Sequence, residues 1–230
     1  MRGSRGERPG LFPSGRTRQT VGMSFFTPLE PDPEPPQEQR KAPPSPIWLR
    51  PPTDEIPVAV PVARRLARVP GAALHLKRID AHRDGIVVVL RLDIRLEDDL
   101  SPERRAEIEA LLDPRRHRAG AERGFRLGVT TAQGSAEQNG MDGRGIVRRM
   151  SGEPPQPPQL TIVDGGGSGT SDHWTSKVGA WLWPLPAEGD VTLHYVSDAV
   201  GIPEGSTTID GELLREAARG VVRVWGDSSP

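Results

Sequence analysis

The chain has 230 residues, which fits one domain of ordinary size or one domain with tails. It contains 30 Lys and Arg residues and 31 Asp and Glu residues, so it lacks the excess of basic residues expected of a nucleic-acid-binding domain. It has no cysteine, which excludes disulfides, a thiolate nucleophile, iron–sulfur clusters and zinc sites with sulfur ligands, and which suits a cytoplasmic location.

Residues 1–54 have the composition of a disordered tail rich in proline and arginine. Fourteen of the 25 prolines fall within residues 1–62, and residues 28–52 alternate proline with acidic residues and glutamine. Such a segment buries too little apolar surface to offset the entropy of ordering it. The first 22 residues carry five arginines without the apolar stretch of a secretory signal, and Met23 is an alternative start. The PxxP spacing at 43–46 fits a solvated tail or a ligand of aromatic grooves.

The ordered domain is expected to begin at residue 55. Valines alternate with prolines over 56–66, and proline inside a strand pattern predicts an edge strand. Apolar residues at every even position from 86 to 96 predict a second strand, and Asp84-Gly85 before it is typical of a two-residue hairpin turn. Pairing about this turn would direct Lys77 into the core. We therefore predict a β-bulge near Lys77-Arg78 that restores the apolar face.

The rest of the chain alternates short strands with turn-rich links. Residues 101–113 predict a helix with Ser101 as its N-cap, and the final periodic segment predicts another helix from Asp210 through residue 219. The residues after 220 are β-branched, so a short strand is the alternative there. Residues 132–145 and the glycine-rich 164–169 are predicted to be loops. Further strands are predicted at 125–130, 146–149, 160–163, 177–183 and 191–196.

About seven strands with period-two patterning predict a mainly β fold, an antiparallel β-sandwich with one inserted helix and a C-terminal helix. The sandwich is expected to span 55–226, with a flexible C-terminus at 227–230. The longest uninterrupted apolar run, residues 86–90, is far shorter than the about 20 residues of a membrane span, so no membrane partner is expected.

Several turn and packing motifs stand out within residues 55–226. They are His82-Arg83-Asp84-Gly85, Phe125-Arg126-Leu127-Gly128-Val129, the glycines 165–167, Trp183-Pro184-Leu185-Pro186, Gly201-Ile202-Pro203-Glu204, and Ile209-Asp210-Gly211 before a helix ending at Trp225. Together they resemble a family of uncharacterised actinobacterial proteins with an immunoglobulin-like sandwich. The resemblance implies that fold, and it implies no activity, cofactor or catalytic residue. Position 82 is tyrosine-like in the family and histidine here.

The glycine-rich segment 164–170 departs from the known glycine motifs. Thr170 stands where a nucleophile elbow or a dinucleotide loop needs glycine, and the Gly-Lys-Ser/Thr of a P-loop is missing. We interpret this segment as a flexible hairpin tip.

Two enzymatic alternatives centre on residues 164–174. His173 and His194, with Asp164 or Asp172, would supply a two-histidine, one-carboxylate metal site. Ser168, with His173 or His194 and Asp172, would supply a hydrolase triad. Nothing in the sequence orients either set. We therefore assign no catalytic, cofactor-binding or metal-binding residue and expect no cofactor.

Trp181 and Trp183 share one face of the predicted strand 177–183, and aliphatic residues share the other. We interpret the tryptophans as packed, with Trp225 as a partner; they would form a binding surface if the aliphatic face alone lies in the core.

Arginine supplies most of the basic residues, and we interpret its clusters as solvated faces. The clusters are Arg64-Arg65-Arg68, Arg115-Arg116-Arg118 and Arg148-Arg149. The function that fits best is a non-enzymatic β-sandwich module that contacts an unknown protein partner. The alternatives are the enzyme described above and nonspecific association of the basic N-terminal tail with nucleic acid, which is not the expected partner. The oligomeric state is not predicted.

Overall fold

The computed structural model describes residues 45–96, 101, 125–139 and 154–225, all within one compact unit, Pro43–Pro230. Several sequence predictions lie outside these residues: the tail up to residue 44, the helix over 102–113, the arginine clusters at 115–118 and 148–149, the strand 146–149, and the C-terminus 227–230. Among the described residues, none of the helices has the length and apolar character needed to cross a membrane.

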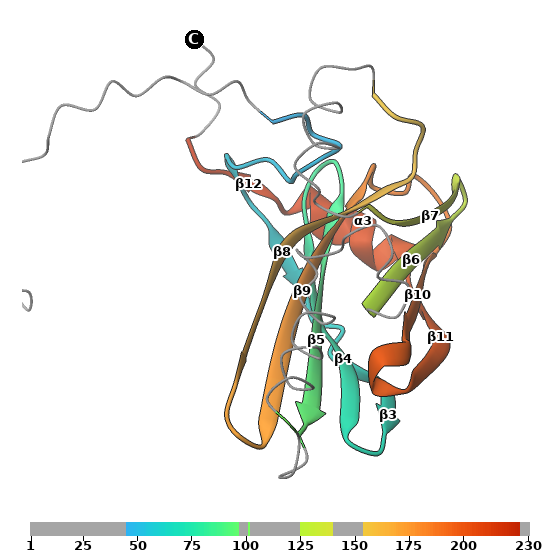
Figure 1. The fold of residues 1–230 in the computed structure, drawn as a ribbon. Coiled ribbons are helices and arrows are strands. Elements are labelled where there is room, and N and C mark those ends of the chain that lie inside the picture. Colours follow the sequence, from blue (N-terminus) through green and yellow to red (C-terminus); the bar gives the residue numbers. More distant parts are fainter. Residues whose placement is uncertain (1–44, 97–100, 102–124, 140–153, 226–230) are drawn as a thin grey trace, which may run out of the picture. The chain divides into compact units, whose positions relative to one another are not determined.

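The described chain is mainly β, as the sequence predicts (Figure 1). Its strands are β1 (Glu55–Ile56), β2 (Val58–Val60), β3 (Arg64–Val69), β4 (Ala72–Ala81), β5 (Ile86–Arg95), β6 (Phe125–Thr131), β7 (Gly134–Asn139), β8 (Gln159–Gly169), β9 (His173–Trp183), β10 (Val191–Ser197), β11 (Ile202–Ile209) and β12 (Val222–Arg223). The helical elements are the short η1 (Asp198–Val200) and α3 (Gly211–Arg219).

One curled sheet contains most of these strands, in the order β11-β10-β6-β7-β8-β9-β5-β4-β2, with β3 also paired to β4. Its pairs are antiparallel except for β7 and β8, which run parallel through Gln138 with Leu160 and Asn139 with Thr161. The sheet is therefore a half-barrel of mixed strands and departs from the predicted antiparallel sandwich. The β7–β8 pairing joins the strands β11-β10-β6-β7 to the strands β8-β9-β5-β4-β2 in one sheet. The alternation of apolar residues within a single strand carries no information about this pairing.

The core fills the concave side of the sheet and continues under α3. In β10, buried Val191, Leu193 and Tyr195 alternate with more exposed residues, as expected for a strand with one face in the core. Leu214 of α3 is buried in the same apolar cluster.

The predicted β-bulge in the first long hairpin is confirmed. Leu76 pairs with Leu90 and Arg78 with Val89, so Lys77 is the extra residue. The turn lies one residue earlier than predicted: the N–H of His82 donates to the carbonyl of Gly85 at 2.9 Å, which centres the turn on residues 83–84. Gly85 serves packing instead, because a Cβ there would collide with the Leu182 carbonyl and the Trp181 ring.

The glycine-rich segment 164–169 is a strand, and the predicted flexible loop is wrong. These residues extend β8 and pair with β9 between Trp174 and Gly179. The Trp174 ring lies against Gly167 and Gly169, where a Cβ would collide with it. Glycine is poor in strands on average, but here its missing side chain lets an indole pack against the backbone. The hairpin tip falls at residues 170–172.

Residues 45–54, assigned to the tail by sequence, include packed side chains. Leu49 is only 6% exposed, and the carbonyl of Ile47 accepts a hydrogen bond from Trp181 Nε1 at 2.8 Å. The apolar trio 47–49 outweighs the proline-rich composition around it, so packing begins before the predicted boundary at residue 55.

The predictions for the edge strand, the loop at 132–145 and the C-terminal helix have different outcomes. The edge strand over 56–66 is divided among β1, β2 and the start of β3. Residues 134–139, predicted as part of a loop, form β7. Asp210 caps α3 as predicted, since its side chain accepts from the backbone N–H groups of Glu212 and Leu213. The helix ends at Arg219, and β12 follows it.

Candidate functional site

The structure does not assemble the residues considered for a metal site or a hydrolase. His173 begins β9, whereas His194 lies on β10, and β6, β7 and β8 come between these strands in the sheet. His194 Nε2 lies 3.0 Å from Thr130 Oγ1, and Asp164 Oδ2 lies 2.7 Å from Lys177 Nζ. Within the described residues, no three His, Asp or Glu side chains are grouped so that they could hold a metal ion.

Asp172 and Ser168 also have other neighbours. Asp172 is exposed and accepts a hydrogen bond from Thr170 Oγ1 at 2.6 Å, which lowers the pKa of its carboxyl. Ser168 is exposed on β8 and pairs with Thr175 across the hairpin. The hairpin therefore shows no nucleophile held against a base.

His173 lies instead beside Asp93 of β5, with Nε2 3.3 Å from Oδ1. Arg91 Nε donates to both oxygens of Asp93 at 2.9 and 2.8 Å, and Thr175 Oγ1 donates at 3.0 Å. His75 of β4 is farther away, 4.0 Å from Oδ2. Three adjacent strands thus direct their solvent-facing side chains toward one carboxylate.

The Asp93 carboxylate is held in its ionised form. Burial acts to raise its pKa, but the hydrogen bonds from Arg91 and Thr175 and the charges of Arg91 and His173 outweigh burial, and the pKa lies below its ordinary value. The same contact raises the pKa of Arg91. A carboxylate already engaged by several donors is suited to fixing side chains and poorly suited to accepting a proton from a substrate.

Sequence reasoning missed Asp93 because, apart from Arg91, its neighbours come from β4 and β9. The available signal was the alternation of residues 91, 93 and 95 with apolar residues, which places all three on the solvent face of one strand.

Two depressions lie near these groups. A cavity of about 720 Å³ opens at the end of the sheet and is lined by Arg68, Gly71, Asp93, Arg95 and His173, among others. A groove of about 330 Å³ lies across β6, β7 and β10, over Gly128.

The tryptophan face of β9 is covered by other parts of the chain. Trp181 is fully buried, and the His82 ring meets it edge-on at 5.4 Å between ring centroids. Trp183 lies 6.2 Å from the ring of Trp48, which comes from the segment assigned to the tail by sequence. The predicted packing role for Trp225 is wrong, because the chain turns away after β12 and leaves this side chain 80% exposed.

A buried polar contact joins the β4–β5 turn to β1. Glu55 Oε2 lies 3.5 Å from His82 Nδ1, and both side chains are 6% exposed. Arg83 Nε lies 3.7 Å from Glu55 Oε1, and its Nη2 donates to the carbonyl of Val221 at 3.3 Å. Burial lowers the pKa of His82, although the charges of Glu55 and Asp80 oppose this. These contacts anchor the small β1–β12 ribbon to the main sheet.

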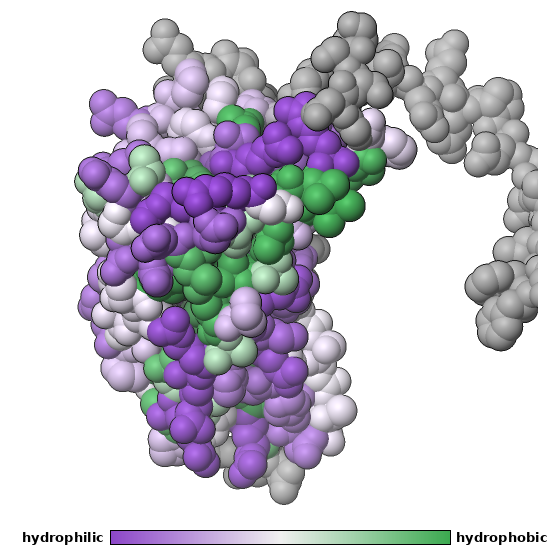
Figure 2. Space-filling view, turned by 180° about the vertical axis from the view of Figure 1, so that it is seen from behind, coloured by the Kyte–Doolittle hydropathy of each residue, from purple (hydrophilic) through white to green (hydrophobic). Residues whose placement is uncertain are grey.

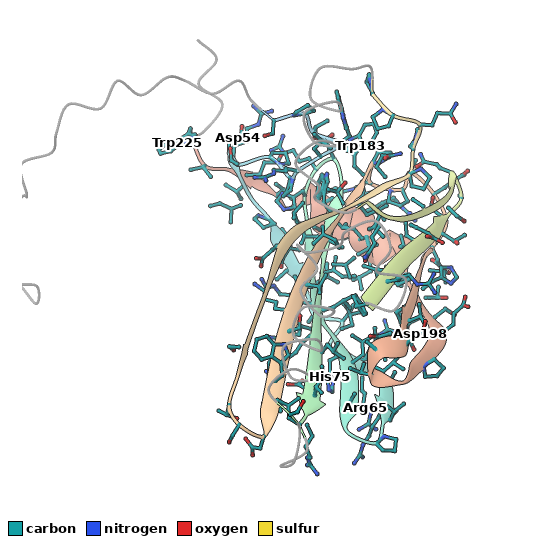
Figure 3. The ribbon with its side chains drawn as sticks, in the orientation of Figure 1. Asp54, Arg65, His75, Trp183, Asp198 and Trp225 are labelled. Carbon is teal, nitrogen blue, oxygen red and sulfur yellow. The ribbon has the colours of Figure 1, made fainter. Side chains whose placement is uncertain are left out.

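The ribbon exposes a cluster of large apolar side chains, which we call the apolar corner: Ile56, Val222, Val224 and Trp225. They are 56, 58, 42 and 80% exposed. Ile56 and Val222 are cross-strand neighbours, and the N–H of Val224 donates to the Asp54 carbonyl at 2.7 Å. Figure 2 shows hydrophobic residues gathered at one upper edge of the molecule, and Figure 3 shows Trp225 next to Asp54 at this end.

No family model matches this chain, and the comparisons with curated proteins and with solved structures found no match either. Function therefore rests on the geometry of the described residues.

Proposed function

We propose that the protein is a non-enzymatic β module that binds another protein through the apolar corner. The observation that carries this proposal is the 80% exposure of Trp225 beside three other exposed apolar side chains. Clustered apolar side chains on a surface are typical of contact sites, and tryptophan is prominent among the residues that dominate interface energies.

The corner is held in place before any partner arrives. The β1–β12 pairing fixes Ile56 against Val222, and Arg83 ties the adjoining backbone at Val221 to the β4–β5 turn. A fixed surface loses less conformational entropy on binding than a mobile one. Arg223, the half-exposed Arg83 and the exposed Asp54 border the corner, so the partner is a protein with an apolar recess and a rim that carries both charges.

The enzymatic alternative and the nucleic-acid tail have less support. The enzymatic residues lie on separate strands, and the tail lies outside the described residues. A divergent immunoglobulin-like sandwich related to the actinobacterial family stays part of the proposal, supported by the two sheet halves that face one core. The cytoplasmic location is likewise proposed from the cysteine-free sequence.

The test is site-specific photocrosslinking in native cells with the full chain. A photoreactive amino acid at Trp225 is expected to give one discrete protein adduct that disappears when Val222→Asp is added. The same photoreactive residue at the exposed Thr208, outside the corner, is the control and should give no such adduct.

The partner so identified should bind the purified Trp225→Ala variant at least about tenfold more weakly, as for a residue at the centre of an interface. Because Trp225 is exposed, the variant should melt at the wild-type temperature. Equal adducts from both positions, or unchanged affinity of the variant, would contradict the proposal.

A further inference from the structure

The solvent side of β3, β4, β5 and β9 carries more positive than negative charge in a chain whose net charge is −1. We call this surface the basic face, and it consists of Arg65, Arg68, Lys77, Arg78, Arg91, Arg95 and Lys177. The carboxylates on or beside it are Asp80, Asp93, Asp164 and Asp172. Figure 2 shows hydrophilic residues covering the lower half of the molecule in that view.

The strand register aligns part of the basic face in a row. Arg65 pairs with His75, His75 with Arg91, and Arg91 with Lys177, so one row crosses four strands. Strands are about 4.8 Å apart, so the row spans about 14 Å. A neighbouring row begins with Arg68 opposite Ala73 and continues through Asp93 to Thr175.

The carboxylates leave several cations uncompensated. Asp80 accepts hydrogen bonds from Arg78, and Asp93 accepts them from Arg91. Asp164 forms an ion pair with Lys177. Arg65 and Arg68 are exposed and form no ion pair among the described residues. Arg95 is also exposed, and its charge helps to lower the pKa of the exposed Asp172 carboxyl.

Three of these groups meet at the 720 Å³ cavity. Arg68 from β3, Arg95 from β5 and His173 from β9 line it, and the Asp93 carboxylate in its wall is already engaged by Arg91, Thr175 and the Nε2 atom of His173. Guanidinium groups match the oxygens of a phosphate in pairs, and Arg68 and Arg95 supply two of them. The cavity therefore suits an anion with several acceptor oxygens.

We propose that the basic face binds the phosphate backbone of duplex nucleic acid, with one phosphate at this cavity and its neighbours along the Arg65–Lys177 row. The row supplies repeated positive charge beyond the cavity, which a single phosphate ion would not use. The described part of the basic face carries no Phe, Tyr or Trp side chain for stacking on unpaired bases, so contact is made with the backbone irrespective of sequence.

This surface is separate from the apolar corner. Figure 3 shows Arg65 and His75 at one end of the described unit and Trp225 at the other. Nucleic acid and a protein partner can therefore occupy the chain together, and the failure of one proposal would leave the other unaffected.

The test measures binding of the full chain to a fluorescent DNA duplex of about 20 base pairs by anisotropy, at several salt concentrations. We expect the logarithm of the binding constant to fall linearly with the logarithm of salt concentration. Arg68→Glu with Arg95→Glu should weaken binding more than tenfold and reduce the steepness of the salt dependence by about two units, one for each lost phosphate contact.

The control is Arg126→Glu with Arg219→Glu, an equal change in charge at exposed positions on β6 and α3, away from the basic face. The basic tail is present in every variant, so its contribution cancels. Melting temperatures verify folding, and Arg68→Gln with Arg95→Gln replaces the reversed pair if that pair unfolds.

Four results would overturn the proposal, of which the first three concern the duplex and its competitors. These three are no duplex binding at low salt, an equal loss in both variant pairs, and tighter binding of heparin or of phosphatidylglycerol vesicles than of the duplex. Stabilisation by inorganic phosphate without duplex binding would also overturn it, because it would show that the cavity holds a free anion. A selective loss of duplex binding in the Arg68 and Arg95 pair would support it.

Discussion

Glu55 and His82 are ionisable side chains held almost entirely out of water, and the burial of His82 has a consequence for stability. Burial lowers the pKa of His82 below its ordinary value of 6.5. The unfolded chain therefore binds a proton at this histidine at a higher pH than the folded protein does. In that range the unfolded state carries more protons, so the free energy of unfolding falls as the pH decreases.

We expect His82→Gln to remove this contribution. The free energy of unfolding of the wild type, measured with urea at about pH 7 and about pH 5, should fall more steeply than that of the variant. His194→Gln, at a half-exposed site on β10, is the matched control and should keep the wild-type dependence. Identical pH dependence in the wild type and His82→Gln would show that burial of this imidazole does not influence stability.

At the scale of elements, two glycines beside β9 have opposite surroundings. A Cβ on Gly85 would lie 2.6 Å from Trp181 Cη2 and would also collide with the Leu182 carbonyl. A Cβ on Gly166 of β8 would meet nothing within 4 Å. We expect Gly85→Ala to lower the free energy of unfolding by roughly 1–3 kcal/mol through overpacking.

Gly166→Ala is the matched control in the same experiment. It should be neutral or raise stability by up to about 1 kcal/mol, because alanine loses less conformational freedom on folding than glycine. Urea unfolding of both variants measures the difference. A larger loss for Gly166→Ala than for Gly85→Ala would refute this account of the two positions.

Alternation of apolar and polar residues predicts a strand with one buried and one exposed face. It fails where a strand is stabilised by residues of a neighbouring strand. Residues 86–96 and 191–196 alternate clearly, and their strands are found as predicted. The apolar pattern shifts by one residue at Lys77, and this shift predicts the β-bulge that the structure shows. The strand at 164–169 has only two side chains, those of Asp164 and Ser168, so it shows no alternation. The Trp174 ring on the next strand explains its glycines, because the ring packs against the backbone at Gly167 and Gly169. The parallel β7–β8 pair depends on register between separate segments.

The candidate site was harder to predict than the fold. Each residue around Asp93 is an ordinary solvent-facing position on its own strand, and only the order β4-β5-β9 brings them together. The apolar corner depends in the same way on the pairing of Ile56 with Val222, which are distant in sequence.

At the scale of the whole described unit, side chains join the two ends of the curled sheet. Tyr195 Oη donates to the Leu66 carbonyl at 2.8 Å, and Arg64 Nη1 donates to Thr207 Oγ1 at 3.1 Å. The described residues of β3 and β11 form no strand ladder with each other. We infer that the buried tyrosine holds this side of the half-barrel closed.

Removing this hydroxyl in Tyr195→Phe is expected to lower the free energy of unfolding by about 1 kcal/mol, since the ring and its packing remain. Amide hydrogen exchange should become faster in β11 and stay unchanged in β5, which is paired on both sides. Arg64→Gln, which removes only an exposed contact, is the comparison and should have less effect. Equal exchange in β11 of Tyr195→Phe and the wild type would exclude the tyrosine as a closing contact.

The pairing of β1 with β12 joins segments more than 160 residues apart along the chain. During synthesis on the ribosome, Glu55 emerges long before Arg223 exists, so the ribbon cannot form until residue 223 has been translated. Until then Ile56 has no cross-strand neighbour and the surface around Trp225 is unbuilt. A chain that stops before Val222 therefore lacks the β1–β12 ribbon, and with it the proposed contact surface.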